Sequence, residues 1–326
     1  METVASARAF WIVEPGRGEI RDEPIAGPGP GELLVRTEFT GISRGTESLV
    51  FGGHVPLSEV ARMRAPFQSG EFPAPVKYGY CNVGVVEGGD PAWSGVRVFV
   101  LYPHQTRYVI PATAAHPVPD DVPAGRAVLA ANMETALNGT WDADPTSEDR
   151  LTVIGAGSVG CLVAWVVQTT IGCDVELVDV NPQRENVATA LGVRFAHASS
   201  VSADRTIVIH TSGSEAGLQM ALNLTAADGV VVEMSWFGDR LVSLPLGEAF
   251  HSRRLTIKSS QVGSLPPARR AEWTFRRRMV KALELLSDPA LDVLITGENA
   301  FEVLPDVMPR LVASPGNTLC HRIRYD

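Results

Sequence analysis

Short stretches in the first 120 residues alternate between apolar and polar positions. Glu32 to Thr37 alternates as a half-buried strand does, because successive strand side chains point to opposite faces. Further strands are predicted at residues 83–87, 96–101 and 106–110. Proline and glycine separate these stretches, as in the run 26–31, so the pattern predicts a small β-barrel. Residues 57–63 are expected to form a short helix within a long loop.

Near residue 126 the pattern changes to buried strands that alternate with helices. The predicted strands are 151–154, 175–178, 206–210 and 230–234, and the predicted helices are 128–139, 184–191 and 215–224. The apolar run 161–170 indicates a further buried helix. This alternation predicts a doubly wound parallel sheet, an α/β architecture with a ligand crevice at the carboxyl ends of its strands.

An amphipathic helix is predicted at 271–286, followed by a last strand at 319–325. Its apolar positions Phe275, Met279, Leu283 and Leu286 have helical spacing and are expected in the core. The basic residues of the same region are expected on a solvated helix face: Arg269, Arg270, Arg276, Arg277, Arg278 and Lys281.

Composition narrows the possible partners. The chain has 326 residues, 45% of them hydrophobic, and a formal net charge of -9, which argues against nucleic-acid or anionic-membrane partners. No apolar run is long enough to span a membrane, and no secretory signal is recognised at the N-terminus. The four cysteines form no CxxC pair, so we expect a reducing, cytoplasmic location.

The segment Gly155-Ala156-Gly157-Ser158-Val159-Gly160 matches the pattern GxGxxG between an apolar strand and an apolar helix. In such a turn the first glycine permits the tight bend, the second lets a pyrophosphate approach and the third lets helix and strand pack closely. Asp179 ends the next strand, where a carboxylate can bind the ribose hydroxyls and repel a 2′-phosphate. These features predict NAD(H) rather than NADP(H), although Asp179 can also cap the turn at Asn181.

Other residues are expected around the same cofactor. Arg184 begins a helix and can cover the adenine, although an arginine there can also serve a 2′-phosphate. Ser212-Gly213 and Ser235-Trp236 follow successive strands and are expected to line the crevice, with Trp236 either stacked on the cofactor or in the core.

Several stretches together resemble the medium-chain dehydrogenase/reductase superfamily. GISRGTE at 41–47 resembles the family's GxCGTD, and the segments 79–84, 95–98 and 178–184 stand where GHExxG, GDRV and VDxxPxR are usual. The resemblance implies a GroES-like catalytic domain at 1–125, a Rossmann NAD-binding domain at 126–261 and a return segment at 262–326. It also places Ser260 and Gln261 beside the nicotinamide amide. GISRGTE is most similar to the bacteriochlorophyllide dehydrogenase branch, which oxidises a hydroxyethyl group to an acetyl group.

The chain departs from this family at the zinc ligands. Ser43 or Arg44 stands in the cysteine position, Tyr80 in the histidine position and Cys81 in the adjacent glutamate position. The later ligand position falls near Ala131 or Asn132, and the cysteine-rich lobe for structural zinc is missing. A zinc site needs about three nitrogen, sulfur or carboxylate ligands, so we expect no zinc. Zincless relatives with a GxxGGVG turn commonly use NADPH, whereas this chain has GAGSVG and an aspartate.

The resemblance implies hydride transfer between a secondary alcohol and a ketone. Donors must then stabilise the carbonyl oxygen in place of a metal, and the candidates are Tyr80, Arg44, Thr46 and Ser43. Arg44 is expected to lower the pKa of the Tyr80 phenol. His104 is expected either to shuttle a proton or to be a hydrogen-bonded loop histidine. The expected substrate pocket contains Tyr102, Glu47 and Cys81.

Two alternatives remain at this point: an NADH-dependent reductase of an activated C=C bond, and a catalytically inactive NAD-binding sensor or scaffold. The expected partners are a small-molecule substrate and a second copy of the chain. We expect the apolar strand 241–244 to form the edge at which the homodimer pairs.

Overall fold

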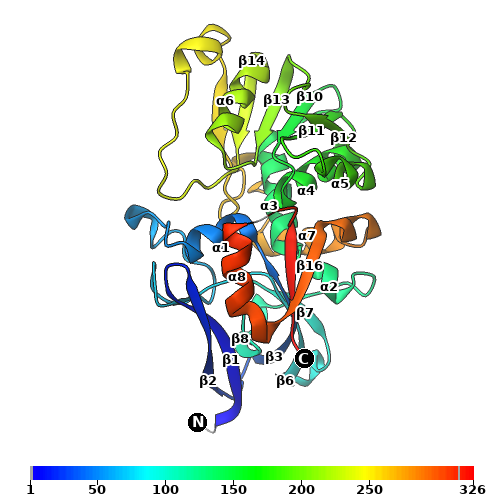
Figure 1. Ribbon diagram of the computed structural model, residues 1–326. Helices are drawn as coiled ribbons and strands as arrows, with labels where there is room; N and C mark the ends of the chain where they lie inside the picture. The colour runs from blue at the N-terminus through cyan, green and yellow to red at the C-terminus, as the bar shows by residue number, and fades with distance from the viewer. Residues whose placement is uncertain (1–2, 315) are drawn as a thin grey trace. The chain divides into compact units, whose positions relative to one another are not determined.

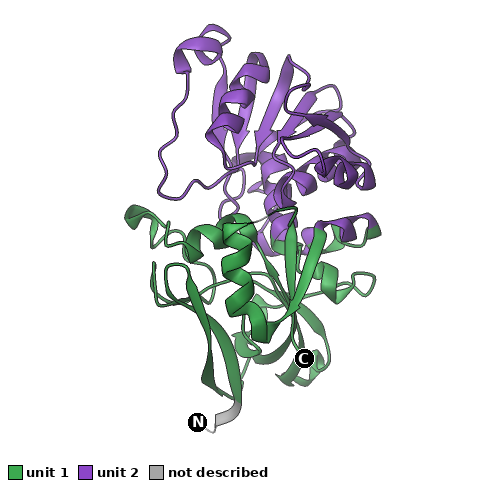
Figure 2. Cartoon of the chain, in the orientation of Figure 1, with its two compact units in different colours: residues 1–131, 283–289, 295–326 green, residues 132–282, 290–294 purple. Residues whose placement is uncertain are grey.

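The computed structural model describes residues 3–314 and 316–326, which fall into two compact units (Figure 2). Unit 1 comprises residues 1–131, 283–289 and 295–326, and unit 2 comprises residues 132–282 and 290–294. The chain therefore returns to unit 1 at Leu283, later than the residue 262 expected from the sequence.

Unit 1 is built on two β-sheets. In the larger sheet the strand order is β16 (Ile295–Ala300), β17 (Cys320–Arg324), β3 (Glu32–Ile42), β6 (Asn82–Gly89), β7 (Arg97–Val100) and β9 (His116–Pro117), with β8 (Arg107–Pro111) also paired to β3. In the smaller sheet the order is β2 (Arg17–Ala26), β1 (Thr3–Glu14), β5 (Val76–Lys77) and β4 (Ser69–Gly70). Alternate residues of β3 and its neighbours, among them Leu33, Val35 and Ile110, form a buried cluster. The predicted strands are present, and the β1–β2 hairpin was missed because β2 buries none of its residues and shows no apolar face.

Short helices accompany these sheets. They are α1 (Arg44–Phe51), α2 (Ala124–Ala127), α8 (Leu304–Ala313) and the 3₁₀ turns Leu57–Glu59, Pro91–Trp93, Ala112–Ala114 and Phe301–Val303. The 3₁₀ turn Pro289–Leu294 begins in unit 1, and its residues 290–294 belong to unit 2. The helix predicted at 57–63 is thus only a single 3₁₀ turn.

Unit 2 contains a six-stranded parallel sheet in the order β12 (Arg194–His197), β11 (Asp174–Asp179), β10 (Arg150–Ile154), β13 (Arg205–His210), β14 (Thr225–Glu233) and β15 (Thr256–Ser259). Its helices are α3 (Ala130–Ala143), α4 (Ser158–Val166), α5 (Arg184–Ala190), α6 (Glu215–Leu224) and α7 (Phe275–Leu285), and shorter turns lie at Val167–Ile171, Leu246–Phe250 and Pro267–Arg269. Figure 1 labels these elements along the chain. The order runs outward in both directions from β10, as in a doubly wound sheet, so this prediction is confirmed.

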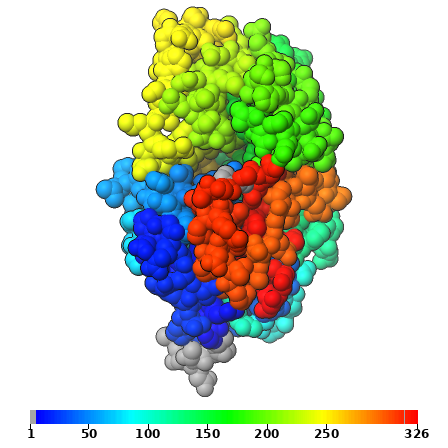
Figure 3. Space-filling view, viewed as in Figure 1, coloured from blue at the N-terminus to red at the C-terminus, as the bar shows by residue number. Residues whose placement is uncertain are grey.

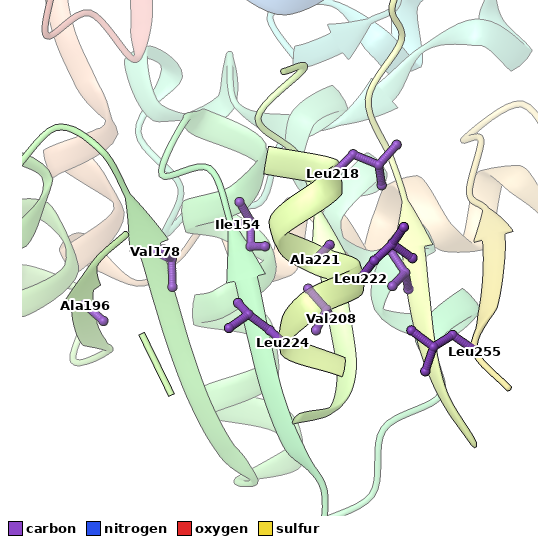
Figure 4. Packing of buried hydrophobic residues seen from close by; sticks show 10 residues of the cluster. Ile154, Val178, Ala196, Val208, Leu218, Ala221, Leu222, Leu224 and Leu255 are labelled. Atoms are coloured by element: carbon purple, nitrogen blue, oxygen red, sulfur yellow. The ribbon is translucent and has the colours of Figure 1, made fainter. Parts of the chain in front are cut away.

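The core of unit 2 follows from the alternation of side chains along its strands. Ile154, Val178 and Val208 pack with the apolar residues of α6, Leu218, Ala221, Leu222 and Leu224 (Figure 4). The alternate positions Val153, Leu177 and Ile209 are also buried, so both faces of the sheet are covered.

Helix α7 corrects two predictions. Phe275 is 53% exposed, whereas Arg278 on the supposedly solvated face is buried. Arg278 donates to Glu134 at 3.1 Å, to the Asn138 side chain and to the Val262 carbonyl oxygen at 2.6 Å. These buried bonds explain why residues 262–282 group with unit 2.

The predicted edge strand at 241–244 is wrong. These residues form no strand, and Leu241 is 98% exposed. Figure 3 shows the segment around residue 250, coloured yellow, on the surface of unit 2. Strands β12 and β15 are the two edges of this sheet instead, because each has one neighbour among the described strands. None of the helices in residues 3–314 and 316–326 has the length and apolar character that a membrane crossing requires.

Candidate functional site

The glycine turn between β10 and α4 has the geometry that a pyrophosphate needs. Gly155 has φ +105°, and a Cβ there would lie 2.7 Å from the Ser212 Cα atom. A Cβ on Gly160 would lie 1.8 Å from the Gly155 carbonyl oxygen, so this glycine lets helix and turn meet. At Gly157, by contrast, a Cβ would meet no atom within 4 Å. The roles expected of the first and third glycines are confirmed, and the second borders open space.

Gly157 also occupies the N-cap position of α4. No side chain caps this helix end, so the first-turn amides, which include those of Ser158 and Val159, are not satisfied by a cap. A helix N-terminus with such amides carries a partial positive charge and suits an anionic group. Turn and helix together therefore form a cradle for a phosphate.

Asp179 lies at the end of β11, beside this turn. Its Oδ2 accepts from the Ala156 amide at 2.7 Å and its Oδ1 accepts from the Asn181 amide at 2.8 Å. The turn-capping bond is thus present, but a carboxylate has about four acceptor sites, so two bonds leave capacity for ribose hydroxyls. Arg184 is buried at the start of α5. The pKa of the nearby Cys161 thiol is raised chiefly by burial; the positive charge of Arg184 lowers it and the negative charge of Asp179 raises it further.

The ends of β13 and β14 hold a hydrogen-bonded group that sequence analysis found only in part. His210 is fully buried, and its Nδ1 lies 2.6 Å from Glu233 Oε2. Its Nε2 lies 2.6 Å from the Oγ of Ser212, an exposed residue. Ser235 accepts from the Gly213 amide at 3.0 Å and donates its own amide to Glu233. His210 and Glu233 were missed, although both are polar residues that end adjacent buried strands in register.

The remaining cofactor candidates lie elsewhere in unit 2. Trp236 is half-buried, so it is not a core tryptophan. Ser260 is half-buried and donates to Asp142 at 2.7 Å, and Gln261 is exposed and accepts from the Gly263 amide. Both follow β15, which continues the carboxyl edge of the sheet.

In unit 1, a buried chain of hydrogen bonds begins at α1. Glu47 Oε2 lies 2.9 Å from His104 Nε2, and His104 Nδ1 lies 2.7 Å from Thr40 Oγ1. Thr40 in turn lies 3.1 Å from the Tyr325 hydroxyl. All four residues are less than 10% exposed. Thr40 and Tyr325 were missed because 285 positions separate them and β3 and β17 bring them together only in the fold.

Glu47 connects this chain to the segment that carries Ser43. Its Oε1 accepts from the Ser43 amide at 2.7 Å, at the start of α1. Its negative charge raises the pKa of the Tyr80 phenol and of the Cys81 and Cys320 thiols, in each case after desolvation, which is the larger cause. Burial together with this charge therefore favours the protonated forms of Tyr80, Cys81 and Cys320.

The expectation that Arg44 lowers the pKa of Tyr80 is wrong. Desolvation raises the pKa of this phenol well above its ordinary value, and a hydrogen bond with the Ser43 side chain opposes the shift only in part. The Tyr80 side chain is half-buried and packs edge-on against Tyr78, with ring centroids 5.9 Å apart. Arg44 and Thr46 are half-buried on the first turn of α1.

The expected pocket residues occupy different surroundings. Cys81 is buried beside Glu47. Tyr102 is buried too, but it stacks on Tyr108, with ring centroids 3.8 Å apart, and lies against Phe67. Its ring therefore belongs to the aromatic packing of unit 1.

The positions at which the resemblance led us to look for zinc ligands do not fit the metal. Ser43 and Tyr80 offer hydroxyl groups, so Cys81 alone among them offers a side chain of the kind that zinc commonly binds, whereas a zinc site needs about three such ligands. Within residues 3–314 and 316–326, no group of three or more histidine, cysteine, aspartate or glutamate residues is placed to hold a metal ion.

Known proteins similar to this chain are dehydrogenases. No family model matches it. The L-threonine 3-dehydrogenase of Xanthomonas campestris pv. campestris is 25% identical over 248 residues, which cover 68% of this chain and 72% of the relative.

Solved structures match over almost the whole length. L-idonate 5-dehydrogenase of Escherichia coli superposes with a TM-score of 0.79 at 13% identity, covering 98% of each chain. A short-chain alcohol dehydrogenase of E. coli CFT073, solved with NADH, superposes with a TM-score of 0.77 at 19% identity, covering 98% of this chain and 99% of that one. The predicted fold class, a GroES-like β-rich domain with a Rossmann sheet, is confirmed by this agreement.

Proposed function

We propose that this chain, which resembles the medium-chain dehydrogenase/reductase superfamily, is an NAD(H)-dependent dehydrogenase that interconverts a secondary alcohol and a ketone without a catalytic zinc. The observation that carries the proposal is the glycine turn of unit 2, where Gly157 borders open space at the uncapped start of α4. A nicotinamide cofactor supplies the hydride when it is bound there.

Asp179 supports NAD(H) over NADP(H). Its carboxylate is half-buried beside the turn and retains acceptor capacity for two ribose hydroxyls. A 2′-phosphate would bring a second negative charge against it.

In unit 1, the protonated Tyr80 phenol is the donor that we assign to the substrate oxygen. During ketone reduction this oxygen becomes alkoxide-like, and a hydrogen bond that strengthens as the charge develops lowers the barrier. The raised pKa keeps the phenol neutral, so it donates its proton only to a strongly basic oxygen such as an alkoxide. Ser43, bonded to Tyr80, orients the hydroxyl.

We assign His104 a positioning role. Both of its ring nitrogens are occupied by Glu47 and Thr40, and the side chain is 1% exposed. Glu47 in turn accepts a hydrogen bond from the Ser43 amide. This series of buried hydrogen bonds therefore fixes the backbone at Ser43, whose side chain is bonded to Tyr80.

Turnover tests the reaction type. The protein is incubated with NADH and a panel of ketones, and separately with a panel of enones, while NADH absorbance is followed. Ketone reduction that persists after chelator treatment supports the proposal. Turnover of enones alone would indicate a C=C reductase, NADH binding without any turnover would indicate a sensor or scaffold, and one zinc per chain in the active protein would contradict zinc independence.

Cofactor choice is tested by titrating NADH and NADPH into the parent and into Asp179→Ser. We expect the parent to favour NADH by at least ~1.4 kcal/mol, which is a tenfold difference in affinity. In Asp179→Ser the difference in affinity between NADH and NADPH should be smaller. Equal affinities of the parent for the two cofactors would contradict the assignment of NAD(H).

The proposed partners are a small-molecule substrate and a second copy of the chain. Edge strand β15 supports the latter, because its outer backbone groups are the ones another sheet edge can pair. Light scattering at micromolar concentration tests this, and a monomer would contradict it.

A further inference from the structure

Ser212, His210 and Glu233 stand in the order and at the distances of an acyl-transfer triad. Ser212 Oγ lies 2.6 Å from His210 Nε2, and the other ring nitrogen lies 2.6 Å from Glu233 Oε2. In such a triad the serine attacks, the histidine takes its proton and the carboxylate holds the ring in the required tautomer. Nothing in hydride transfer requires a serine to be paired in this way.

The surroundings hold the histidine rigidly and leave the serine accessible. His210 is fully buried, Phe237 stacks on its ring at a centroid distance of 6.3 Å, and Glu233 Oε1 is held by the Ser235 amide at 2.6 Å. Ser212, by contrast, is exposed. A Cβ on Gly217 would lie 2.4 Å from Ser212 Oγ and 2.7 Å from His210 Nε2, so this glycine makes room for the pair.

Donors for a developing oxyanion lie beside Ser212 at the start of α6, a ten-residue helix. Ser214 caps this helix by accepting from the Gly217 amide at 3.0 Å, and its own hydroxyl lies 2.9 Å from Ser212 Oγ. The amides of Glu215 and Ala216 belong to the first turn and have no partner within the helix. The amides of Gly213 and Ser214 are closer in sequence but already donate to Ser235 Oγ and Ser212 Oγ, so we assign the amides of Glu215 and Ala216 as donors to the oxyanion.

We propose that Ser212 is a nucleophile for small carboxylic esters and that unit 2 therefore has an esterase activity besides its cofactor site. Ser212 Oγ bonds to the carbonyl carbon while its proton moves to His210 Nε2. The ester C–O bond then breaks, and the leaving alcohol takes that proton. Water, deprotonated by His210, attacks the acyl-serine and releases the carboxylic acid, which restores Ser212.

The chain contains its own control for this chemistry. Ser199 Oγ lies 2.8 Å from His197 Nδ1, a comparable serine–histidine contact, but the other ring nitrogen meets the Val180 carbonyl oxygen at 3.1 Å rather than a carboxylate. His197 is also exposed. If activation of the serine requires a buried histidine that is held by a carboxylate, Ser212 should react and Ser199 should not.

The test uses the full-length protein with a fluorophosphonate probe and with p-nitrophenyl acetate, and peptide mass spectrometry locates the modified serine. We expect labelling at Ser212 and not at Ser199, with ester hydrolysis lost in Ser212→Ala and unchanged in Ser199→Ala. Glu233→Gln keeps the side-chain shape and should slow labelling by roughly 10²-fold or more. The proposal is overturned if the probe labels Ser212 no faster than Ser199. It is also overturned if Ser212 is labelled at the parental rate in a folded Glu233→Gln variant. The comparison within the parent decides the matter even if that variant does not fold.

NADH protection keeps this proposal separate from the proposed function. The Ser212 backbone packs against Gly155 of the glycine turn, so a bound dinucleotide should slow the probe. If NADH does not change the rate of labelling at Ser212, the assignment of Ser212 as a nucleophile still stands, but the proposed position of the cofactor is contradicted.

Discussion

Two alanine substitutions in the same turn separate cofactor binding from folding. Gly157 has φ -79° and ψ -178°, which alanine adopts without strain, and its added Cβ would meet no protein atom within 4 Å. In Gly160→Ala the added Cβ would lie 1.8 Å from the Gly155 carbonyl oxygen. One methyl group therefore enters the space proposed for the pyrophosphate, and the other enters the protein backbone.

The expected magnitudes differ accordingly. Gly157→Ala changes an N-cap residue, which costs less than about 1 kcal/mol, and the lower entropy of the unfolded chain offsets about 0.4–1 kcal/mol. Its free energy of unfolding should stay close to that of the parent. Gly160→Ala forces helix and turn apart by more than 1 Å, because Cβ–oxygen contacts below 3.0 Å essentially do not occur. Overpacking of this kind costs about 1–3 kcal/mol or more.

Urea unfolding and NADH titration of both variants provide the measurements. We expect Gly157→Ala to unfold with the parent and to bind NADH at least ~10-fold more weakly, a loss of about 1.4 kcal/mol. Gly160→Ala should unfold at lower urea. Parental NADH affinity in Gly157→Ala would refute the placement of the pyrophosphate, and parental stability in Gly160→Ala would refute the close packing.

Three further predictions concern individual side chains. Tyr80→Phe should lower ketone turnover roughly 10²–10³-fold and leave NADH affinity unchanged, since it removes one donor to the reacting oxygen; parental turnover would contradict the role given to the phenol. Arg278→Leu should lower the free energy of unfolding by about 3–5 kcal/mol in urea, because it leaves Glu134 buried without its cation, whereas the exposed Arg276→Leu should cost less than about 1 kcal/mol. Burial raises the pKa of Cys161 to about 12, so the unfolded chain loses this proton first and stability should fall as pH rises from about 9 to about 12. The fall, followed by alkaline unfolding, should be shallower in Cys161→Ala.

Local patterns located four of the six strands of the parallel sheet in unit 2, whereas β12 and β15 were not predicted and the strand expected at 241–244 is absent. Helix 215–224 was predicted with the bounds that the structure shows, and the strands at 151–154 and 206–210 differ from β10 and β13 by one residue at one end. These elements bury continuous apolar stretches, so hydrophobic periodicity and the glycine motif are visible in short windows of sequence. The roles of Gly155 and Gly160 also followed from the motif, because the tight turn depends on neighbouring residues.

Tertiary structure alone decided which polar groups meet and which residues are buried. Glu47 and His104 are 57 positions apart, and His210 and Glu233 are 23 apart, so no local pattern pairs them. Helical spacing likewise could not show that Arg278 is buried and Phe275 exposed, because the buried partner Glu134 lies on another helix. The direction of the Tyr80 pKa shift depended on desolvation by surrounding segments, a quantity that exists only after the chain has folded. Sequence thus determined the elements, whose hydrophobic patterns are local, and the fold determined the chemistry, whose energies depend on distance and burial.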